Sequence, residues 1–237
     1  TTDIYTLSLH DALPISFGGT VDALRRLNSR HPWNHNDAFH PWILTRLPAA
    51  HGLAIDVGCG RGELLALLAE RFDRVQGVDI DADMRRVSSA RCAGLPNATV
   101  TLSDLADLPT GADLVTMIAV LHHMDLRSTL EQVARILNPG GRFLCVGLAR
   151  PESVTDRMWD AASMITNPII GFVRHPWPST APAWPPPFPV RDPELNFAEI
   201  DAGTRSIMPG AKLPHHLGFR SEEHTSELHS RQSISYA

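Results

Sequence analysis

The stretch AIDVGCGRG places three glycines, Gly58, Gly60 and Gly62, directly after an apolar run. Asp56 lies inside that run, and Asp79 lies near the end of the next one along the chain. A glycine-rich turn between a strand and a helix lets a ligand approach the backbone closely, because no side chain occupies that space. The pattern therefore predicts a ligand site at this turn.

The spacing of the glycines helps to distinguish a dinucleotide from other ligands. Dinucleotide-binding enzymes use the spacing G-x-G-x-x-G to seat a pyrophosphate at a helix N-terminus. Here the residue three positions after Gly60 is Glu63. A carboxylate at that position would face a pyrophosphate unfavourably, so the spacing disfavours a dinucleotide.

Strand and helix patterns alternate around this turn. A compact apolar run at residues 53–58 suits a strand buried on both faces, and further strands are predicted at residues 74–80, 98–102, 112–121 and 142–148. Helical patterns occupy residues 41–47, 81–91, 128–137 and 194–208, and four leucines between positions 64 and 68 suit a helix that packs on a sheet. The alternation predicts an α/β fold with a doubly wound, mostly parallel sheet covered by helices on both faces.

Further motifs follow the glycine turn in order: LSDLADLP at 102–109, AVLHHM at 119–124 and LNPGGRFL at 137–144. Together with Asp56, the glycines and Asp79, they resemble the class I S-adenosylmethionine (SAM)-dependent methyltransferases. The resemblance covers about residues 48–147 and extends more weakly to about residue 219. It is closest in kind to small-molecule methyltransferases such as the quinone-biosynthesis enzymes. It implies a Rossmann-like fold, SAM as cofactor and a small-molecule acceptor.

The same resemblance implies which residues bind the cofactor. In that family an acid at the position of Asp79 binds the ribose hydroxyls, Asp104 would face the adenine amino group, and Leu105 would face the adenine ring. The full set of implied cofactor-binding residues is Asp56, Gly58, Gly60, Gly62, Asp79, Ile80, Asp104 and Leu105.

Methyl transfer from a sulfonium places few demands on catalytic side chains. It is an in-line displacement with a good leaving group, so the protein mainly aligns donor and acceptor and excludes water. A general base is needed only where the acceptor loses a proton. His122 and His123 follow the fourth predicted strand, where the acceptor pocket is expected, and imidazole is the usual base near neutral pH. They are the candidate catalytic residues; the alternative is that they form a wall of the pocket.

The histidine-rich segment near the N-terminus has two interpretations. His31, His35 and His40 have a spacing that invites a metal site, but no acid or cysteine completes a set of ligands, so no metal site is predicted. We expect this segment, with Trp33 and Asn34, to form a lid over the cofactor.

Other residues carry weaker indications. Trp177 and Trp184 lie in a proline-rich stretch at 174–193 and would line an apolar acceptor pocket, whereas Trp159 is expected in the core. Cys59 is interpreted as a small filler between glycines. Arg61 would meet either a carboxylate or solvent.

Both ends of the chain resemble translated sequencing adapters, TLSLHDALPIS at 6–16 and RSEEHTSEL at 220–228. We therefore expect a non-native leader at 1–16, an N-terminal helical cap at 17–47 and a SAM-binding core at 48–150. Acceptor-side helices, the proline-rich loop and a last strand would occupy 151–220, followed by a non-native tail at 221–237. The family's C-terminal antiparallel hairpin would then be truncated, with its first arm at 211–218.

Composition limits the remaining function classes. The chain has 237 residues and a formal net charge of −5, which argues against nucleic acid as the main partner. Three scattered cysteines suggest no disulfide framework, and with no apolar run long enough to cross a bilayer they favour a cytoplasmic location without membrane insertion. The leading hypothesis is a SAM-dependent methyltransferase. An NAD-dependent oxidoreductase and a non-catalytic SAM-binding protein stay as alternatives, and the acceptor and the oligomeric state stay open.

Overall fold

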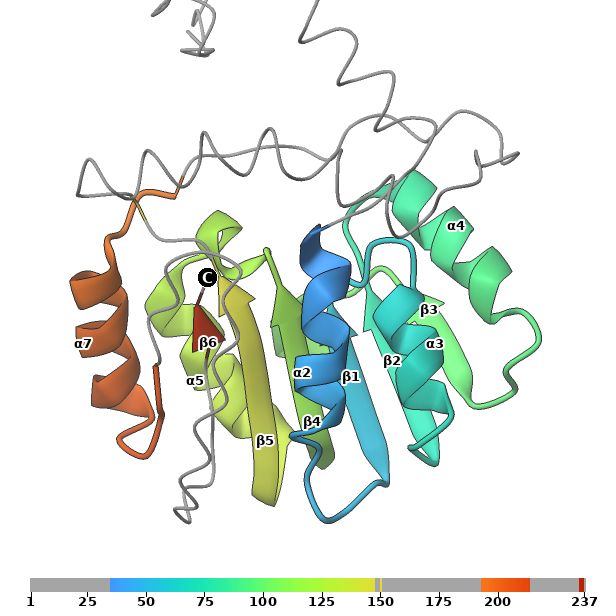
Figure 1. Cartoon of the computed structure of the whole chain (residues 1–237), viewed down its shortest axis with the longest axis horizontal. Helices are drawn as coiled ribbons and strands as arrows, with labels where there is room; N and C mark the ends of the chain where they lie inside the picture. Colours follow the sequence, from blue (N-terminus) through green and yellow to red (C-terminus); the bar gives the residue numbers. More distant parts are fainter. Residues whose placement is uncertain (1–34, 148–149, 151–192, 214–234, 237) are drawn as a thin grey trace, which may run out of the picture. The chain divides into compact units, whose positions relative to one another are not determined.

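The computed structural model describes residues 35–147, 150, 193–213 and 235–236. Their centre is a six-stranded sheet in the order β3-β2-β1-β4-β5-β6, in which every described pair of neighbours is parallel (Figure 1). The strands are β1 (Leu53–Val57), β2 (Arg74–Val78), β3 (Ala98–Thr101), β4 (Ala112–Ile118), β5 (Leu137–Gly147) and β6 (Ser235–Tyr236). The predicted parallel α/β fold is confirmed.

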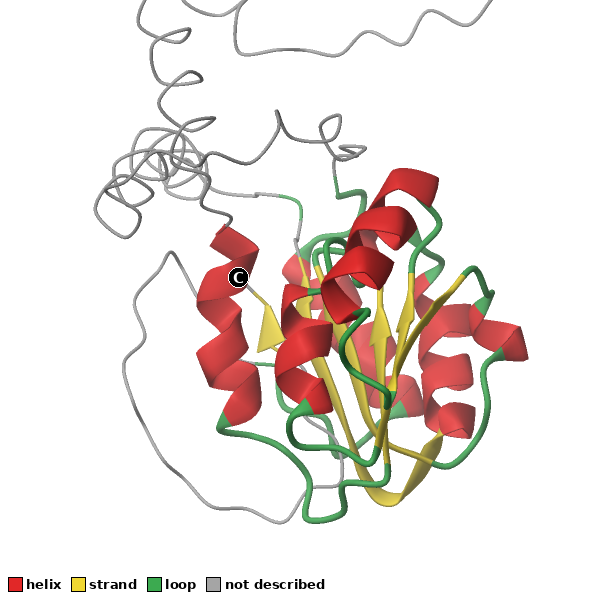
Figure 2. Ribbon diagram, turned by 90° about the vertical axis from the view of Figure 1, so that its right-hand side faces the viewer, coloured by secondary structure: helices red, strands yellow, loops and turns green. Residues whose placement is uncertain are grey.

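Helices cover both faces of the sheet (Figures 1 and 2). One face packs against α2 (His40–Leu44), α3 (Glu63–Ala69) and α4 (Ala82–Cys92), and the other against α5 (Leu126–Ile136) and α7 (Phe197–Ile207). Three 3-10 turns complete the described elements: η2 (His35–Phe39), η3 (Leu105–Asp107) and η4 (Leu121–His123). Among the described residues, no helix is long and apolar enough to cross a membrane.

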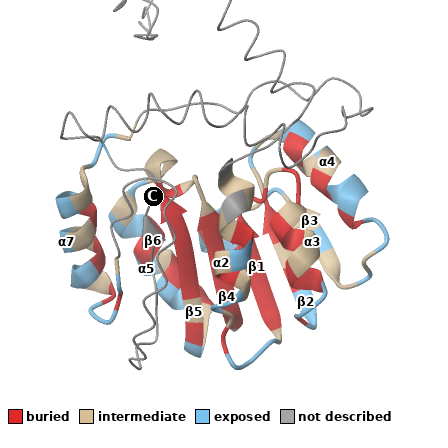
Figure 3. Cartoon of the chain, viewed as in Figure 1, coloured by how far each residue is buried: buried red, intermediate tan, exposed pale blue. Residues whose placement is uncertain are grey.

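The two faces of the sheet have separate apolar cores because neighbouring residues of a strand point to opposite sides. In β1, Ile55 packs into the core that α5 and α7 cover, whereas Ala54 packs into the core under α2 and α3. In β4, Val115 and Leu114 divide in the same way. Figure 3 shows the central strands as almost wholly buried. Continuous burial explains why these strands are near-continuous apolar runs in the sequence.

Carboxylate and amide caps fix where the helices begin. Asp81 accepts hydrogen bonds from the backbone N–H groups of Asp83 and Met84 at the start of α4. Asp125 accepts one from Ser128, so α5 begins at Leu126 rather than at the predicted residue 128. In α7, Asn196 and Glu199 form a reciprocal capping box.

The fifth strand begins earlier than predicted. β5 starts at Leu137, which pairs with Ala112, and pairing resumes at Arg142 opposite Leu114 after a register shift. The Asn-Pro-Gly-Gly segment between them ends α5 as predicted, but it is an irregularity within the strand rather than a loop before it. Gly140 has a φ of +86°, which a residue with a side chain rarely adopts. Asn138 closes the segment by donating hydrogen bonds to the Gly111 carbonyl and to Asp113.

The edge strand β6 is short and comes from the segment predicted to be a non-native tail. Ser235 pairs with Val146 and Tyr236 with Gly147, both in parallel orientation. Residues 211–213 of the last predicted strand are not in a strand, and the rest of it lies outside the described residues. The described strands contain no antiparallel pair, so the truncated hairpin stays a prediction.

Candidate functional site

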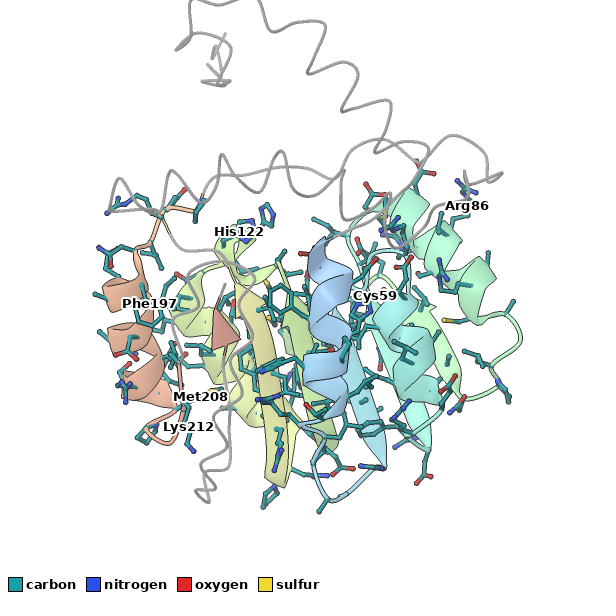
Figure 4. The ribbon with its side chains drawn as sticks, viewed as in Figure 1. Cys59, Arg86, His122, Phe197, Met208 and Lys212 are labelled. Carbon is teal, nitrogen blue, oxygen red and sulfur yellow. The ribbon has the colours of Figure 1, made fainter. Side chains whose placement is uncertain are left out.

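The glycine turn lies where β1 ends, between β2 and β4 in the sheet. From β1 the chain first adds β2 and β3 on one side of the sheet and then β4 and β5 on the other. The end of β1 is therefore the point where the strand order reverses, at which open parallel sheets bind ligands. The backbone N–H groups of Gly58 and Cys59 donate to the Val78 carbonyl at 2.7 and 3.0 Å, which ties the turn to the end of β2. Figure 4 shows Cys59 and His122 toward the same end of the sheet.

Two of the glycines are required by the packing of the chain itself. Gly58 and Gly62 have φ values of +69° and +76°. A methyl group on Gly58 would collide with the side chain of Val120, and one on Gly62 would lie 2.9 Å from Cβ of Ser88. The space beside these residues is therefore filled by α4 and by the segment after β4, not reserved for a ligand.

Asp79 joins the glycine turn to the end of β2, as the sequence predicts for a shared site. One carboxylate oxygen accepts a hydrogen bond from Gly60 N–H at 2.8 Å, and the other accepts one from Asp81 N–H at 2.9 Å. Burial raises the pKa of Asp79, and these two hydrogen bonds oppose that rise. The neighbouring Ile80 is 81% exposed, which leaves an apolar side chain next to the carboxylate.

The two residues expected to face adenine differ in their surroundings. Asp104 is exposed and immediately precedes η3. Leu105 is only 9% exposed, because it packs in the core beneath α5. Leu102, which sequence reasoning missed, is 65% exposed at the end of β3. The exposure of this leucine could not be predicted from the sequence, because an apolar residue at the end of a strand is normally expected to be buried.

Asp56 is buried beneath the glycine turn. It is 3% exposed, and Oδ1 accepts a hydrogen bond from the Thr116 hydroxyl at 2.6 Å. Burial raises the pKa of Asp56 to about 7; Thr116 opposes this rise, and the negative charges of Asp79 and Glu63 add to it. This carboxyl is therefore held near its point of half-ionisation at neutral pH.

The arginine after the second glycine meets a carboxylate of its own chain. Arg61 is 7% exposed, with Nε 3.5 Å from a carboxylate oxygen of Glu63, and Arg91 donates to the same oxygen at 2.9 Å. The solvent interpretation of Arg61 is therefore wrong. The neighbouring cations also compensate the charge of Glu63, so its predicted repulsion of a pyrophosphate is a weaker argument than the sequence suggested.

His40 is a buried side chain of α2 rather than an exposed metal ligand. Its Nε2 lies 3.9 Å from a carboxylate oxygen of Asp37, and burial lowers its pKa, with Glu63 opposing. Among the described residues, no group of three or more metal-ligating side chains occurs. The remaining residues of the predicted lid and of the tryptophan set lie outside the described side chains: His31, Trp33, Asn34, His35, Trp159, Trp177 and Trp184.

Cys59 fits its predicted role as a small filler. The side chain is buried, and a methyl group added to Gly77 of β2 would lie 2.9 Å from its sulfur. Burial raises the pKa of the Cys59 thiol well above its usual range. A thiol with a raised pKa is a poor nucleophile, so Cys59 supports the shape of the turn rather than chemistry.

The predicted histidine pair forms the η4 turn after β4. The rings of His122 and His123 lie 4.0 Å apart, centroid to centroid, at an angle of 40°. Ala119, which begins this segment, has a φ of +56°, a strained value for a residue with a side chain. Strain of this kind concentrates at functional sites.

A cavity of about 350 Å³ adjoins this histidine pair. Both apolar and ionisable residues from η4, from the start of α5 and from the segment before α7 line it. The lining residues are Leu121, His122, His123, Met124, Asp125, Leu126, Pro193, Glu194, Leu195 and Ile200. The lining residues of this cavity do not include those of the glycine turn.

The fold defines a Rossmann-like α/β protein, and comparison with known proteins identifies its family. Residues 55–145 match the methyltransferase domain family. The chain is 33% identical over 184 residues to an uncharacterised methyltransferase of Mycobacterium tuberculosis, covering 76% of this chain and 89% of that protein. The chain belongs to the class I SAM-dependent methyltransferases. The methyltransferase prediction is thus confirmed, and the NAD-dependent oxidoreductase alternative is wrong.

Two further relatives extend this result. The chain is 36% identical over 145 residues to the demethylmenaquinone methyltransferase of Symbiobacterium thermophilum, which covers 56% of each protein. The crystal structure of the YcgJ protein from Bacillus subtilis matches with a TM-score of 0.51 at 23% identity, over 73% of this chain and 68% of that one. This structural likeness supports the fold alone.

Proposed function

We propose that the protein transfers the methyl group of SAM to a small, mainly apolar acceptor bound in the cavity beside η4. The observation that carries this proposal is the position of that cavity. It adjoins His122 and His123 directly after β4, and β4 is the neighbour of the strand that bears the glycine turn. The quinone-directed relative supports an acceptor of this class.

The described residues fit the adenosine part of SAM. Asp79 is held by two backbone N–H groups and would accept the ribose hydroxyls with its remaining lone pairs. Ile80 and Leu102 are exposed apolar side chains just after the ends of adjacent strands and would hold the adenine ring. Asp104, which is exposed, would accept a hydrogen bond from the adenine amino group. When bound, SAM supplies an electrophilic methyl group on a sulfonium.

The cavity side of the site orients the acceptor. Leucine, methionine and isoleucine side chains exclude water from it, while one of the two imidazoles accepts the proton of a hydroxyl acceptor. The lining residues among the described part of the chain include no lysine or arginine. A neutral acceptor therefore suits this lining better than a phosphorylated one.

The nucleoside side is tested by calorimetric titration of S-adenosylhomocysteine (SAH), with NAD as the comparison ligand. We expect SAH to bind and NAD not to bind. Asp79→Ala is expected to weaken SAH binding roughly 10- to 100-fold, because it removes hydrogen bonds to a charged acceptor. Asp73→Ala, an exposed acid before the other end of β2, is the matched control and should leave binding unchanged. A folded protein that ignores SAH would overturn the proposal.

The cavity side is tested by transfer of radiolabelled methyl groups from SAM to a panel of quinols, phenols, amines and phosphorylated compounds. Leu195→Trp, which fills the cavity, should abolish transfer while SAH still binds with its original affinity. Ala202→Trp, on the exposed face of α7, is the control of equal bulk. His122→Ala and His123→Ala should lower the rate for hydroxyl acceptors. Unchanged transfer by the Leu195 variant would place the acceptor elsewhere.

A further inference from the structure

An arginine on α5 holds the turn that follows β3. Nη2 of Arg135 donates hydrogen bonds to three carbonyl oxygens of this turn, those of Leu105 at 2.9 Å, Ala106 at 3.0 Å and Leu108 at 3.3 Å. Its Nε donates to the side chain of Gln132 at 2.8 Å, which fixes the plane of the guanidinium. A single side chain thus binds three of the four peptide carbonyls between Leu105 and Leu108.

The apolar side of the same turn is also fixed to α5. Leu105 and Leu108 are 9% and 2% exposed and share a core with Leu130 and Val133 of that helix. Asp104 precedes the turn, is exposed, and makes no capping hydrogen bond to it. The carboxylate of Asp104 is therefore not used to build the turn, while its backbone position depends on a turn that α5 holds from two sides.

A second arginine binds backbone carbonyls at the end of β2. Nη1 of Arg85, on α4, donates to the carbonyl oxygens of Asp79 at 2.9 Å and Ile80 at 2.8 Å. The two arginines come from helices on opposite faces of the sheet. Arg85 binds backbone carbonyls at Asp79 and Ile80, and Arg135 binds backbone carbonyls of the turn that follows Asp104 and contains Asp107.

We propose that Arg135 is a positioning residue for nucleobase selection: by holding the turn after β3, it places Asp104 to accept a hydrogen bond from a 6-amino group and so favours adenine over a 6-oxo purine. This inference rests on the proposed function, because it assumes that SAM binds beside Asp79. Arg85, in contrast, holds the segment that contains Asp79, which is proposed to bind the ribose. The ribose is identical in ligands that carry either purine. Loss of Arg135 should therefore change selectivity, whereas loss of Arg85 should change affinity alone.

The test measures the dissociation constants of SAH and of its 6-oxo analogue, S-inosylhomocysteine, and compares their ratio between variants. Arg135→Gln should lower the preference for SAH by roughly three- to tenfold, as expected for loss of partly exposed charge-assisted hydrogen bonds that act through a neighbour. Arg135→Lys keeps the charge but not the planar fork, so it should restore only part of the preference. Arg85→Gln should weaken both ligands by the same factor and leave the ratio unchanged.

Two further variants complete the design. Asp104→Asn should remove most of the preference, because an amide can donate to a 6-oxo group as well as accept from a 6-amino group. Arg127→Gln, an exposed arginine in the first turn of the same helix, should leave both constants unchanged. Thermal melting of each variant serves as the control that the variant is folded.

The outcomes separate this inference from the proposed function. If wild-type protein does not bind SAH, the proposed function itself fails. If SAH binds but Asp104→Asn keeps the full preference, or if Arg135→Gln and Arg135→Lys weaken both ligands equally, the positioning role of Arg135 is overturned while the cofactor site stands.

Discussion

The buried carboxyl of Asp56 beneath the glycine turn makes stability depend on pH in a direction that burial determines. Burial raises the pKa of Asp56 from 3.8 to about 7, so the folded state retains a proton that the unfolded chain releases near pH 4. Between these two values the folded state binds more protons than the unfolded state. The free energy of unfolding therefore falls as pH rises from about 4 to about 7, and levels off above that range.

The magnitude follows from the same numbers. One unit of pKa difference corresponds to about 1.4 kcal/mol, so a shift of this size corresponds to about 4 kcal/mol at most. Asp56 is 3% exposed, so solvent screens little of this effect, but structural relaxation around a buried charge usually reduces it. We expect a loss of about 2–4 kcal/mol across the window.

The perturbation is Asp56→Asn, which keeps the shape of the side chain and the acceptor for the Thr116 hydroxyl but cannot ionise. The assay is urea unfolding of both proteins at several values between pH 4.5 and 8. The variant should gain stability relative to wild type as pH rises, because only wild type must bury a carboxylate. Other titrating groups, such as His40, are common to both proteins and cancel in the difference.

Two comparisons make the result decisive. Asp73→Asn removes an exposed acid, so its difference from wild type should not change with pH. Thr116→Val removes the hydroxyl that donates to the ionised form, so it should steepen the loss of stability above neutral pH. A difference between wild type and Asp56→Asn that stays constant from pH 4.5 to 8 would refute the reasoning.

Three further perturbations test the packing around the site. Gly62→Ala should lower the free energy of unfolding by about 1–3 kcal/mol, because its φ is +76° and the added methyl meets Ser88; Gly94→Ala, with open space beside it, is the control. Leu130→Ala should cost about 2–5 kcal/mol in chemical denaturation, since the side chain is fully buried beneath the sheet. His40→Gln should flatten the loss of stability below pH 6.5, because burial lowers the pKa of His40 and protonation then opposes folding; an unaltered acid limb would contradict this.

The elements of the fold follow from the sequence where burial is continuous. The predicted limits of β1, β2 and β3 differ from the observed ones by at most two residues. Burial is continuous in β1, whereas β3 has no fully buried residue and was found from its β-branched residues. β4 was expected to extend to Leu121 but ends at Ile118. Ala119 has a positive φ at that point, and no residue type in AVLHHM predicts it.

The site is predictable where side chains of adjacent strands meet. Asp79 could be placed beside the glycine turn because the carboxyl ends of parallel neighbours lie at one edge of the sheet. Arg85 and Arg135 could not be found in this way, since their partners are backbone carbonyls, which every residue carries. The exposure of Leu102 was also missed, because it depends on the path of the chain after β3 and not on the residue type.

The position of β1 accounts for the two sides of the proposed site. β1 pairs with β2 on one side and with β4 on the other, and its glycine turn contacts both the Val78 carbonyl and the Val120 side chain. The residues assigned to the nucleoside follow β2 and β3, whereas the cavity follows β4. A substitution on one side can therefore change cofactor binding without filling the acceptor space. A change at Gly58, which packs against Val120 and binds the end of β2, should disturb both.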